Sequence, residues 1–542
     1  MTLDTNFDLC VIGSGPAGMI MTMEYMEKHP ESRVLMVEFG FTGQPKQNSL
    51  DDSIDIKVPG NHHEPYNCTN KGLGGTSLTW GGRCVMYDEI DFLKRPSINN
   101  NCTWDLDFFE EVKPFVPKAT KFFECGDPVF DLKKIPKFED THIAEDFTEG
   151  IVTDSRIERW SMPTRFGKRY GETLEQLPNL KILLGYEARD FGNLDENGKV
   201  SSLKIRSVEN KGYDEVKAKN FVIAAGGQES TRLLLRNTHL FDRLKRVPQA
   251  LGKFYQCHLF GKIASIIFNG DPKKTDFGFL RNADGTYIRR RMQFKTSYLK
   301  KNDLLNTAFW LDNPFYYDPK HKNGSMSFMY LTMLIPFLAK KLAPPAITHT
   351  ITKGKKIGIQ KHLLNLAKDF PGSFITPARI FYKRYLIARK LPGIFLFSPT
   401  NKYALYFQSE QLPIAENRME LSPENDRLVI NYGFTDKDVD SIIKTHKALD
   451  KHLRDTGCGK LEYWHKEEDL GKVIKQISKD GVHQIGTTRI AESPEDGVVD
   501  RNLRVHGTDN VYVCSSSVFP TSGQANPTFF LGACAVRLAN HI

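Results

Sequence analysis

Residues 13–18 read Gly-Ser-Gly-Pro-Ala-Gly, a spacing of glycines that lets backbone amides approach a phosphate closely. The apolar run Phe7 to Ile12 before them predicts a buried strand, and a helix is expected after them, to about Lys28. A second predicted strand, Arg33 to Val37, ends at Glu38, whose carboxylate could accept hydrogen bonds from a ribose. We therefore predict a dinucleotide site that includes Gly13, Gly15, Pro16, Ala17, Gly18 and Glu38.

This motif identifies a dinucleotide but does not distinguish FAD from NAD. Glu38 disfavours NADP, because a carboxylate would repel the 2′-phosphate. A glycine turn that binds no ligand is the alternative, but strand, glycines, helix, strand and acid occur here in the expected order. No second GxGxxG follows a strand, so the sequence provides for one dinucleotide.

A second group of glycines surrounds Trp80, in the sequence GLGGTSLTWGGRCVMYDEIDF of residues 72–92. With it the chain resembles the glucose-methanol-choline (GMC) family of FAD-dependent oxidoreductases, in particular the bacterial branch near the pyranose oxidases. Residues 221–236, FVIAAGGQESTRLLLR, resemble the strand and helix that cover the adenine end in this family. Residues 483–542 resemble its C-terminal signature almost throughout.

The resemblance implies that the dinucleotide is FAD. It adds cofactor-binding residues from these segments: Gly74, Gly75, Thr76, Thr79, Trp80, Gly81, Gly82, Ala225, Gly226, Ser515, Ser516, Asn526, Pro527 and Thr528. Many relatives have a histidine where this chain has Thr79, and threonine cannot form the histidyl link to flavin. Non-covalent FAD is therefore expected.

Oxidation of an alcohol by hydride transfer needs a base for the hydroxyl proton, and imidazole can act as one near neutral pH. The family pattern HxxGTxR places this base at His483, with Asn526 as the partner that orients the substrate oxygen. Asn526 before Pro527 is also a good helix N-cap, so a purely capping role is the alternative. Weaker candidates, interpreted as structural or loop residues, are His258, His506 and the pair His62-His63.

We predict that the elements which position these residues form an α/β fold, α+β overall. The resemblance implies a discontinuous Rossmann-type FAD-binding domain and a substrate domain built on an antiparallel sheet. Residues 1–98, 165–260 and 478–542 are assigned to the FAD-binding domain, and residues 99–164 and 261–477 to the substrate domain. Predicted strands of the substrate domain are Lys262–Phe268, Tyr287–Phe294, Lys402–Gln408 and Arg427–Ile430.

Composition places the chain among globular proteins, since 40% of its 542 residues are hydrophobic and 26% are charged. Nine scattered cysteines without a CxxC motif predict reduced thiols and no metal site. The polar, acidic start has no signal-peptide pattern, so a cytoplasmic location is expected.

The net charge of +9 is concentrated in one segment, residues 340–392, in which twelve basic residues stand against the single acid Asp369. Its apolar stretches suggest peripheral contact with an anionic membrane surface, but a solvated face of the substrate domain explains the charge equally well. A nucleic acid partner is not expected. The longest apolar run nearby, Phe328 to Ala339, is too short to span a bilayer.

Together these features predict an FAD-dependent alcohol oxidase or dehydrogenase that acts on a sugar, glycoside or cyclitol, with His483 as general base. The same chemistry on a sterol-like or lipid alcohol is one alternative. A non-redox nucleotide-binding protein that associates with membranes is another. The electron acceptor, whether oxygen, a quinone or another carrier, and the oligomeric state are left open by the sequence.

Overall fold

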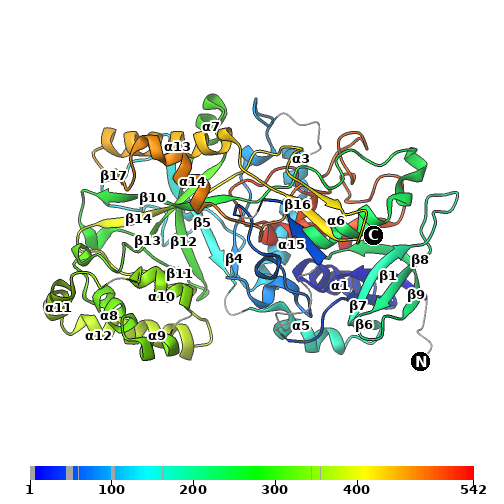
Figure 1. Cartoon of the computed structure of the whole chain (residues 1–542), viewed down its shortest axis with the longest axis horizontal. Coiled ribbons are helices and arrows are strands. Elements are labelled where there is room, and N and C mark those ends of the chain that lie inside the picture. Colours follow the sequence, from blue (N-terminus) through cyan, green and yellow to red (C-terminus); the bar gives the residue numbers. More distant parts are fainter. Residues whose placement is uncertain are drawn as a thin grey trace.

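The computed structural model describes residues 6–43, 53–58, 60–98, 104–161, 164–342, 345–354 and 356–542. Two parts, each built on its own large sheet, lie side by side along the long axis (Figure 1). The predicted fold class, α/β with a Rossmann-type part and an antiparallel sheet, is confirmed.

The first part is a seven-stranded sheet in the order β6-β2-β1-β9-β8-β7, with β18 added on β9. Its strands are β1 (Asn6–Ile12), β2 (Val34–Glu38), β6 (Leu180–Leu184), β7 (Tyr186–Phe191), β8 (Ser202–Ser207), β9 (Tyr213–Ile223) and β18 (Val511–Val513). β6, β2, β1, β9 and β18 run parallel, whereas β7 and β8 form an antiparallel extension. The parallel core is the doubly wound arrangement that binds dinucleotides at the carboxyl ends of its strands.

Helices cover this sheet and bring its N- and C-terminal segments together. They are α1 (Pro16–Lys28), α3 (Leu106–Val112), α4 (Val116–Phe123), α5 (Phe166–Glu175), α6 (Gly226–Arg236) and α15 (Pro527–His541). α1 packs against α15, so the first and last helices share one core. The strand–helix–strand unit predicted for residues 7–38 is confirmed to within one or two residues of its limits.

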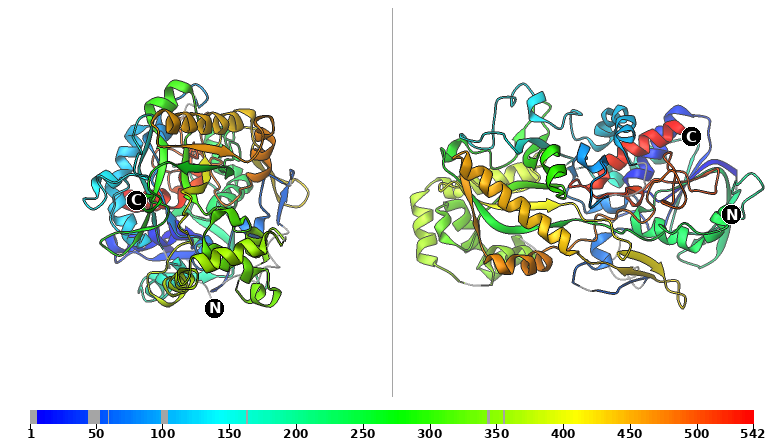
Figure 2. Two further views of the ribbon diagram at one scale, coloured as in Figure 1. Left: turned by 90° about the vertical axis from the view of Figure 1, so that its left-hand side faces the viewer. Right: turned by 90° about the horizontal axis from the view of Figure 1, so that it is seen from above.

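The second part is an antiparallel sheet in the order β17-β10-β14-β13-β12-β5-β4, with β11 added on β12. Its strands are β4 (Arg83–Cys84), β5 (Val152–Trp160), β10 (Leu259–Phe268), β11 (Leu280–Arg281), β12 (Tyr287–Phe294), β13 (Thr307–Asp312), β14 (Lys402–Ser409) and β17 (Gly459–Tyr463). One face forms a core with α13 (Asp436–Asp455) and α14 (Leu470–Ile477). In the view from above, α13 lies along this sheet (Figure 2).

Three of the four predicted strands of the substrate domain belong to this sheet. The fourth is a strand too, β16 (Leu428–Asn431), but it pairs with β15 (Arg418–Leu421) and β3 (Ile54–Ile56) in a separate three-stranded sheet. The sequence of this segment predicted a strand but not the strands with which it pairs, because pairing depends on which apolar face lies opposite. The residue limits of the two domains stay a prediction.

The basic segment is helical and extends from the second part, at the lower left of Figure 1. Its helices, and those that remain, are α2 (Pro65–Cys68), α7 (Thr296–Asn302), α8 (Gly324–Met333), α9 (Pro336–Leu342), α10 (Pro345–Thr352), α11 (Ile359–Lys368) and α12 (Gly372–Phe381). Among the described residues, no helix combines the length and apolarity that crossing a membrane would require. Eight cysteines are buried and free, as predicted, while Cys102 lies outside the described residues.

Candidate active site

A pocket opens at the carboxyl ends of β1, β2 and β9, where the glycine motif meets the C-terminal segment. Thirteen residues predicted to bind the cofactor line it: Gly13, Gly15, Pro16, Ala17, Glu38, Gly75, Thr76, Trp80, Ala225, Gly226, Ser515, Ser516 and Thr528. The other predicted residues are not part of its lining: Gly18, Gly74, Thr79, Gly81, Gly82, Asn526 and Pro527. Six of these residues belong to the surrounding backbone. Asn526 lies beside His483, as described below.

Glycines are required in this pocket for two different reasons. A Cβ at Gly18 would lie 2.1 Å from the carbonyl oxygen of Gly13, so only glycine lets α1 start this close to β1. At Gly15 and Gly226, by contrast, an added Cβ would meet nothing within 4 Å. Their backbone therefore borders open space, as expected where a pyrophosphate lies against a helix N-terminus.

Glu38 lies buried at the end of β2 and lines the pocket. Its Oε1 accepts from the Gly40 amide at 2.9 Å, and its Oε2 from the amide and hydroxyl of Ser14 at 2.9 and 2.7 Å. The Gly72 backbone also hydrogen-bonds to this carboxylate, so each of its roughly four acceptor positions already meets a donor of the protein. Burial raises the pKa of Glu38, against the opposing effect of these donors. Helix terminus, glycines and acid together fit an FAD or NAD dinucleotide.

Several residues that line the pocket were not among the predicted cofactor-binding residues. They are Phe39, Asn70, Lys71, Tyr186, Glu229, Arg232, Arg236 and Gln484. Lys71 and Glu229 form an ion pair of 3.0 Å that joins the loop before the second glycine cluster to α6. Such pairs depend on tertiary neighbours, which the sequence does not show.

His483 and Asn526, the predicted catalytic residues, lie together. The side-chain amide of Asn526 donates to Nε2 of His483 at 2.8 Å, and Nδ1 of His483 lies 2.9 Å from Oδ2 of Asp480. Because a carboxylate only accepts, the proton of a neutral His483 ring belongs on Nδ1. Nε2 is then the unprotonated nitrogen, which is the state that a general base requires, and its lone pair accepts from Asn526.

Asp480 is the functional residue that sequence reasoning missed. It is fully buried, and its Oδ1 accepts from the amides of Gly481 and Val482 at 2.8 and 2.9 Å. Its Oδ2 accepts from the His258 amide at 3.1 Å as well as from His483. Although burial opposes ionisation, these histidines hold the pKa of Asp480 well below its ordinary value. A carboxylate three residues before the motif histidine was the available signal.

His258, predicted to be structural, contacts the candidate base directly. Its Nδ1 lies 3.1 Å from Nδ1 of His483, and the two rings meet edge to face. Burial lowers the pKa of His258, so this ring stays neutral beside Asp480. The same three side chains are a donor set that a metal ion could use. Their mutual hydrogen bonds already account for the arrangement.

Of the other histidines weighed from the sequence, His62 and His63 lie beside the backbone of Asp480, and the His63 amide donates to the Asp480 carbonyl at 2.8 Å. His62 bonds to the hydroxyl of Tyr255 at 2.8 Å, and His506 to the carbonyl oxygen of Ala491 at 3.1 Å. Both interactions hold loops in place, which fits the structural interpretation.

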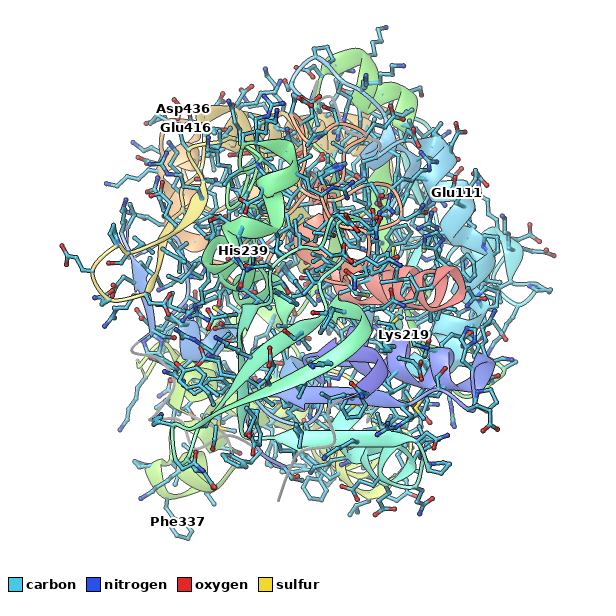
Figure 3. The ribbon with its side chains drawn as sticks, turned by 90° about the vertical axis from the view of Figure 1, so that its right-hand side faces the viewer. Glu111, Lys219, His239, Phe337, Glu416 and Asp436 are labelled. Carbon is cyan, nitrogen blue, oxygen red and sulfur yellow. The ribbon has the colours of Figure 1, made fainter. Side chains whose placement is uncertain are left out.

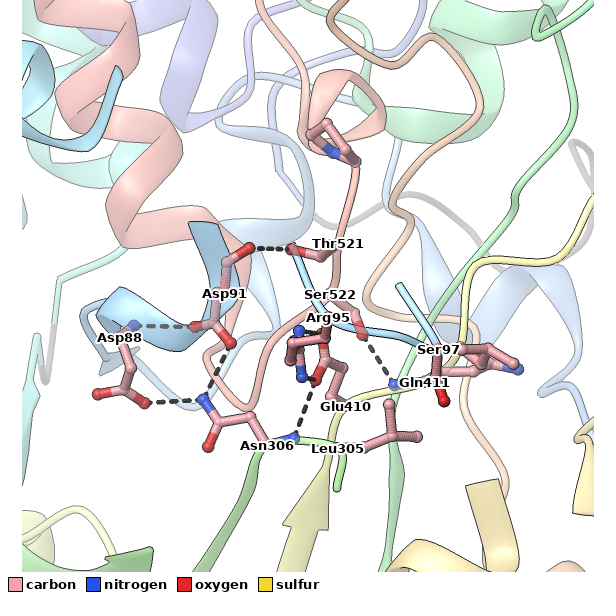
Figure 4. Close-up of polar contacts among 12 residues, drawn as sticks. Asp88, Asp91, Arg95, Ser97, Leu305, Asn306, Glu410, Gln411, Thr521 and Ser522 are labelled. Carbon is pink, nitrogen blue, oxygen red and sulfur yellow. Dashed lines mark hydrogen bonds and ion pairs between the residues drawn. The ribbon is translucent and has the colours of Figure 1, made fainter. Parts of the chain in front are cut away.

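A polar network fixes the loop that ends in Asn526 (Figure 4). The Thr521 hydroxyl donates to the Asp91 carbonyl at 3.0 Å, and the Ser522 hydroxyl accepts from the Gln411 amide at 2.9 Å. Beneath them, Arg95 and Glu410 form a buried bidentate ion pair with distances of 2.8 and 2.7 Å. The loop is thereby tied to the antiparallel sheet as well as to α15.

Asn526 is at the N-cap of α15, yet its side chain makes no capping hydrogen bond. Pro527 at the first helical position removes one donor that a cap would otherwise satisfy. Capping by this side chain, the alternative weighed from the sequence, is thus absent. The amide is used toward His483 instead.

Comparison with known proteins places the chain near GMC oxidoreductases. Residues 413–535 match the family model described as GMC oxidoreductase. A 2-methyl-1,2-propanediol dehydrogenase from Mycolicibacterium austroafricanum is 22% identical, with 99% of this chain and 95% of that protein aligned. A 6'''-hydroxyparomomycin C oxidase from Streptomyces lividus is 30% identical over 24% of this chain and 23% of its own.

Solved structures agree at the level of the fold. Pyridoxine 4-oxidase from Mesorbium loti has a TM-score of 0.52 at 16% identity, with 99% of each chain covered. A formate oxidase from Aspergillus oryzae reaches 0.55 at 15% identity, covering 99% of this chain and 98% of that one. The prediction of an oxidoreductase enzyme is confirmed by these oxidase and dehydrogenase relatives. None of them supports the narrower placement near the pyranose oxidases.

Proposed function

We propose that this protein oxidises an alcohol with FAD held non-covalently in the pocket. The observation that carries the proposal is the orientation of His483, whose Nδ1 bonds to Asp480 while Nε2 meets Asn526. FAD, when bound, would accept the hydride of the carbinol carbon. The experiment that tests the proposal is anaerobic bleaching of the flavin absorbance by a panel of monosaccharides, aminosugars, cyclitols, diols and sterols.

Side chains of the protein would carry out the other steps of the reaction. Nε2 of His483 would take the hydroxyl proton, because it is the unprotonated ring nitrogen and Asp480 stabilises the imidazolium that results. The Asn526 amide, which now donates to Nε2, would instead donate to the substrate oxygen as negative charge develops there. Both groups would lie on one side of the reacting carbon.

The substrate that we propose is a hydroxyl of a sugar, glycoside or cyclitol. Support comes from relatives named for a diol and for an aminoglycoside, both polyhydroxylated compounds. A lipid or sterol-like alcohol is the second candidate, favoured by the exposed apolar surface described below. The acceptor that reoxidises the flavin separates oxidase from dehydrogenase, and its identity is tested by supplying oxygen or a soluble quinone after the bleaching step.

Acid precipitation is expected to release all FAD into the supernatant. At position 79, threonine stands where a histidyl link would need an imidazole, and its hydroxyl accepts from Asn70. The measurement is flavin absorbance in supernatant and pellet. Flavin that remains with the precipitated protein would contradict non-covalent binding.

Replacement of Asn526 by alanine is expected to slow flavin reduction by about 10- to 100-fold, the effect of one oriented hydrogen bond. Because this side chain makes no capping bond, the melting temperature is expected to change by less than about 2 °C. Rapid-mixing absorbance and thermal denaturation measure the two effects. A large loss of stability with normal reduction would favour capping over catalysis.

The basic segment offers a surface for peripheral membrane contact, which we propose as the second part of the function. Thirteen of the twenty large hydrophobic side chains that are exposed among the described residues lie between Ile335 and Leu386. Phe337, Phe370 and Leu386 are 65%, 71% and 66% exposed, and Phe337 projects from the edge of the molecule (Figure 3). Apolar surface this concentrated is typical of an interaction site.

Charge on the same helices favours an anionic lipid surface over a protein partner. Lysines 353, 356, 361, 368 and 383 and Arg379 are exposed among these apolar side chains, while Lys355 lies outside the described residues. A cationic residue at an anionic bilayer contributes about 1 kcal/mol, and aromatic side chains insert at the interface. Contact here would bring the protein to a membrane-borne alcohol or to a quinone acceptor.

We expect the protein to float with liposomes that contain anionic lipid at low salt, and to dissociate at about 0.5 M salt. The double variant Phe370→Ser, Leu386→Ser should bind markedly less. Tyr213→Ser, which removes an equally exposed aromatic residue from β9, should bind normally. Failure to float in every condition would refute the contact. Self-association that the double variant abolishes would identify a second copy as the occupant.

A further inference from the structure

Three arginine side chains gather on the face of the antiparallel sheet opposite α13. Arg83 comes from β4, and Arg289 and Arg291 from β12, where alternate residues share one face. Their guanidinium carbons lie 4.7, 4.9 and 5.3 Å from the centroid of the Trp310 ring. One indole is therefore surrounded by three cations.

The charge of this arginine cluster is not balanced. Glu158 of β5 is the one carboxylate that pairs with these arginines among the described residues: its Oε2 lies 3.4 Å from Nε of Arg83 and 3.9 Å from Nε of Arg291, and its Oε1 contacts Arg289. Burial, opposed by Glu158 and assisted by Arg83, lowers the pKa of Arg289 and Arg291 to about 10. Asp312 and Asp88 attract Arg289 and Arg291 from further away, so a single carboxylate in ion-pair contact serves three cations in a site where buried charge is costly.

Hydrogen-bond donors in the cluster are also unmatched. Arg291 is fully buried, and none of its three side-chain nitrogens donates a hydrogen bond to a described residue. Arg289 is 5% exposed, and its Nε likewise donates no hydrogen bond to a described residue. Arg290 between them faces the other side and bonds to Asp276 at 2.9 Å and to the Asp154 carbonyl at 3.0 Å. Both oxygens of Glu158 are also without a hydrogen bond, but a carboxylate has about four acceptor positions, and the open nitrogens of Arg289 and Arg291 carry more N–H groups than that, which indicates a further acceptor.

The cluster is connected to the candidate catalytic pair through one side chain. Nη1 of Arg83 donates to Oε1 of Gln408 at 3.2 Å. The amide of Gln408 donates to the Gln524 carbonyl at 2.8 Å and lies 3.4 Å from Oδ1 of Asn526. The cluster therefore lies one side chain away from Asn526, and a molecule with its hydroxyl at His483 would have to extend past Gln408 to reach these arginines.

We propose that the alcohol substrate carries an anionic oxygen group, a carboxylate or a phosphate, which Arg83, Arg289 and Arg291 bind. This inference rests on the proposed function and deepens it by naming the substrate class. A guanidinium presents its donors as a planar fork that matches two oxygens of such a group. Trp160 and Trp310 shield the cluster from water, which strengthens the attraction.

Binding is measured first without turnover, by calorimetric titration of the FAD-loaded protein with acetate and with inorganic phosphate at low salt. Because the pyrophosphate site is then filled, we expect an anion to bind at the arginine cluster. The affinity should fall about 10- to 100-fold in Arg291→Gln, which removes charge-assisted hydrogen bonds. Arg156→Gln on the neighbouring strand, a 45% exposed side chain beside Asp131, is the matched control and should bind normally.

Turnover provides the second measurement. Flavin reduction is compared for glucose, glucuronate and glucose 6-phosphate, of which the last two distinguish carboxylate from phosphate. In Arg291→Gln we expect a higher KM for the anionic sugar with little change in kcat, because the lost contact serves the ground state and the transition state alike. Arg291→Lys should recover part of the affinity. If Arg291→Gln does not fold, Arg83→Gln, whose side chain is 20% exposed, replaces it.

Two outcomes overturn the inference: no anion binding by the wild-type protein up to tens of millimolar, or equal losses for neutral and anionic sugars in Arg291→Gln. The first means that water satisfies the donors, and the second that the cluster serves the flavin or the fold. Either result, together with reduction by neutral alcohols, leaves the proposed function intact. Anion binding without reduction by any alcohol would refute the proposed function and keep the anion site.

Discussion

Replacement of His483 by alanine is expected to leave FAD bound and to slow flavin reduction by about 10²- to 10⁴-fold, the contribution of a positioned general base. FAD should stay because His483 is not among the residues that line the cofactor pocket. Rapid-mixing absorbance under anaerobic conditions measures the rate, and flavin absorbance of the purified variant measures occupancy.

His465→Ala is the control for this experiment, since it removes an exposed histidine from another part of the chain. It should reduce flavin at the normal rate. Near-normal reduction by His483→Ala would exclude the mechanism proposed here. Loss of FAD together with activity would show that this histidine supports the pocket, and a base role would then need the rate of the reconstituted variant.

Replacement of Asp480 by asparagine is expected to have a comparable effect, about 10²- to 10⁴-fold on flavin reduction. Four N–H groups now point at its two oxygens, and an amide NH₂ would face two of them. Without a carboxylate at Nδ1, the His483 proton is free to move to Nε2, where it blocks proton abstraction.

The same substitution should also destabilise the protein by about 2–4 kcal/mol, because buried donors lose their acceptor. The pH dependence separates the two effects, since a change of tautomer alters the pH profile of reduction and a packing defect does not. Asp436→Asn, at a surface position, is the control for the loss of a carboxylate. Unchanged reduction kinetics in a stable Asp480→Asn protein would show that Asp480 only holds the loop.

Sequence predicted residues 7–38 well because their signals are local. The glycine spacing, the apolar run before it and Glu38 each report on neighbours a few residues away. The last helix was equally clear from Asn526, Pro527 and the apolar run that follows. Local signals of this kind also placed three strands of the antiparallel sheet.

What sequence did not predict depends on contacts between distant segments. Asp480 looks like a surface acid in SKDGVH, and its contact with the amide of His258, more than two hundred residues away, could not be inferred from the sequence. Alternation along β12 predicted the strand, but not that Arg289 and Arg291 would face a buried indole. The count of charges along the sequence identified residues 340–392 as basic. It did not identify the smaller arginine cluster in the interior of the protein.

The order in which the segments of the first sheet are synthesised determines when the cofactor pocket can form. β18 pairs with β9 on the edge opposite β1. The residues around Ser515 and Thr528 complete the pocket that begins at Gly13. During synthesis, domains fold as their residues emerge from the ribosome. The cofactor pocket can close only after residues 511–531 have been made, so a ribosome-bound chain stalled before that point should not retain flavin.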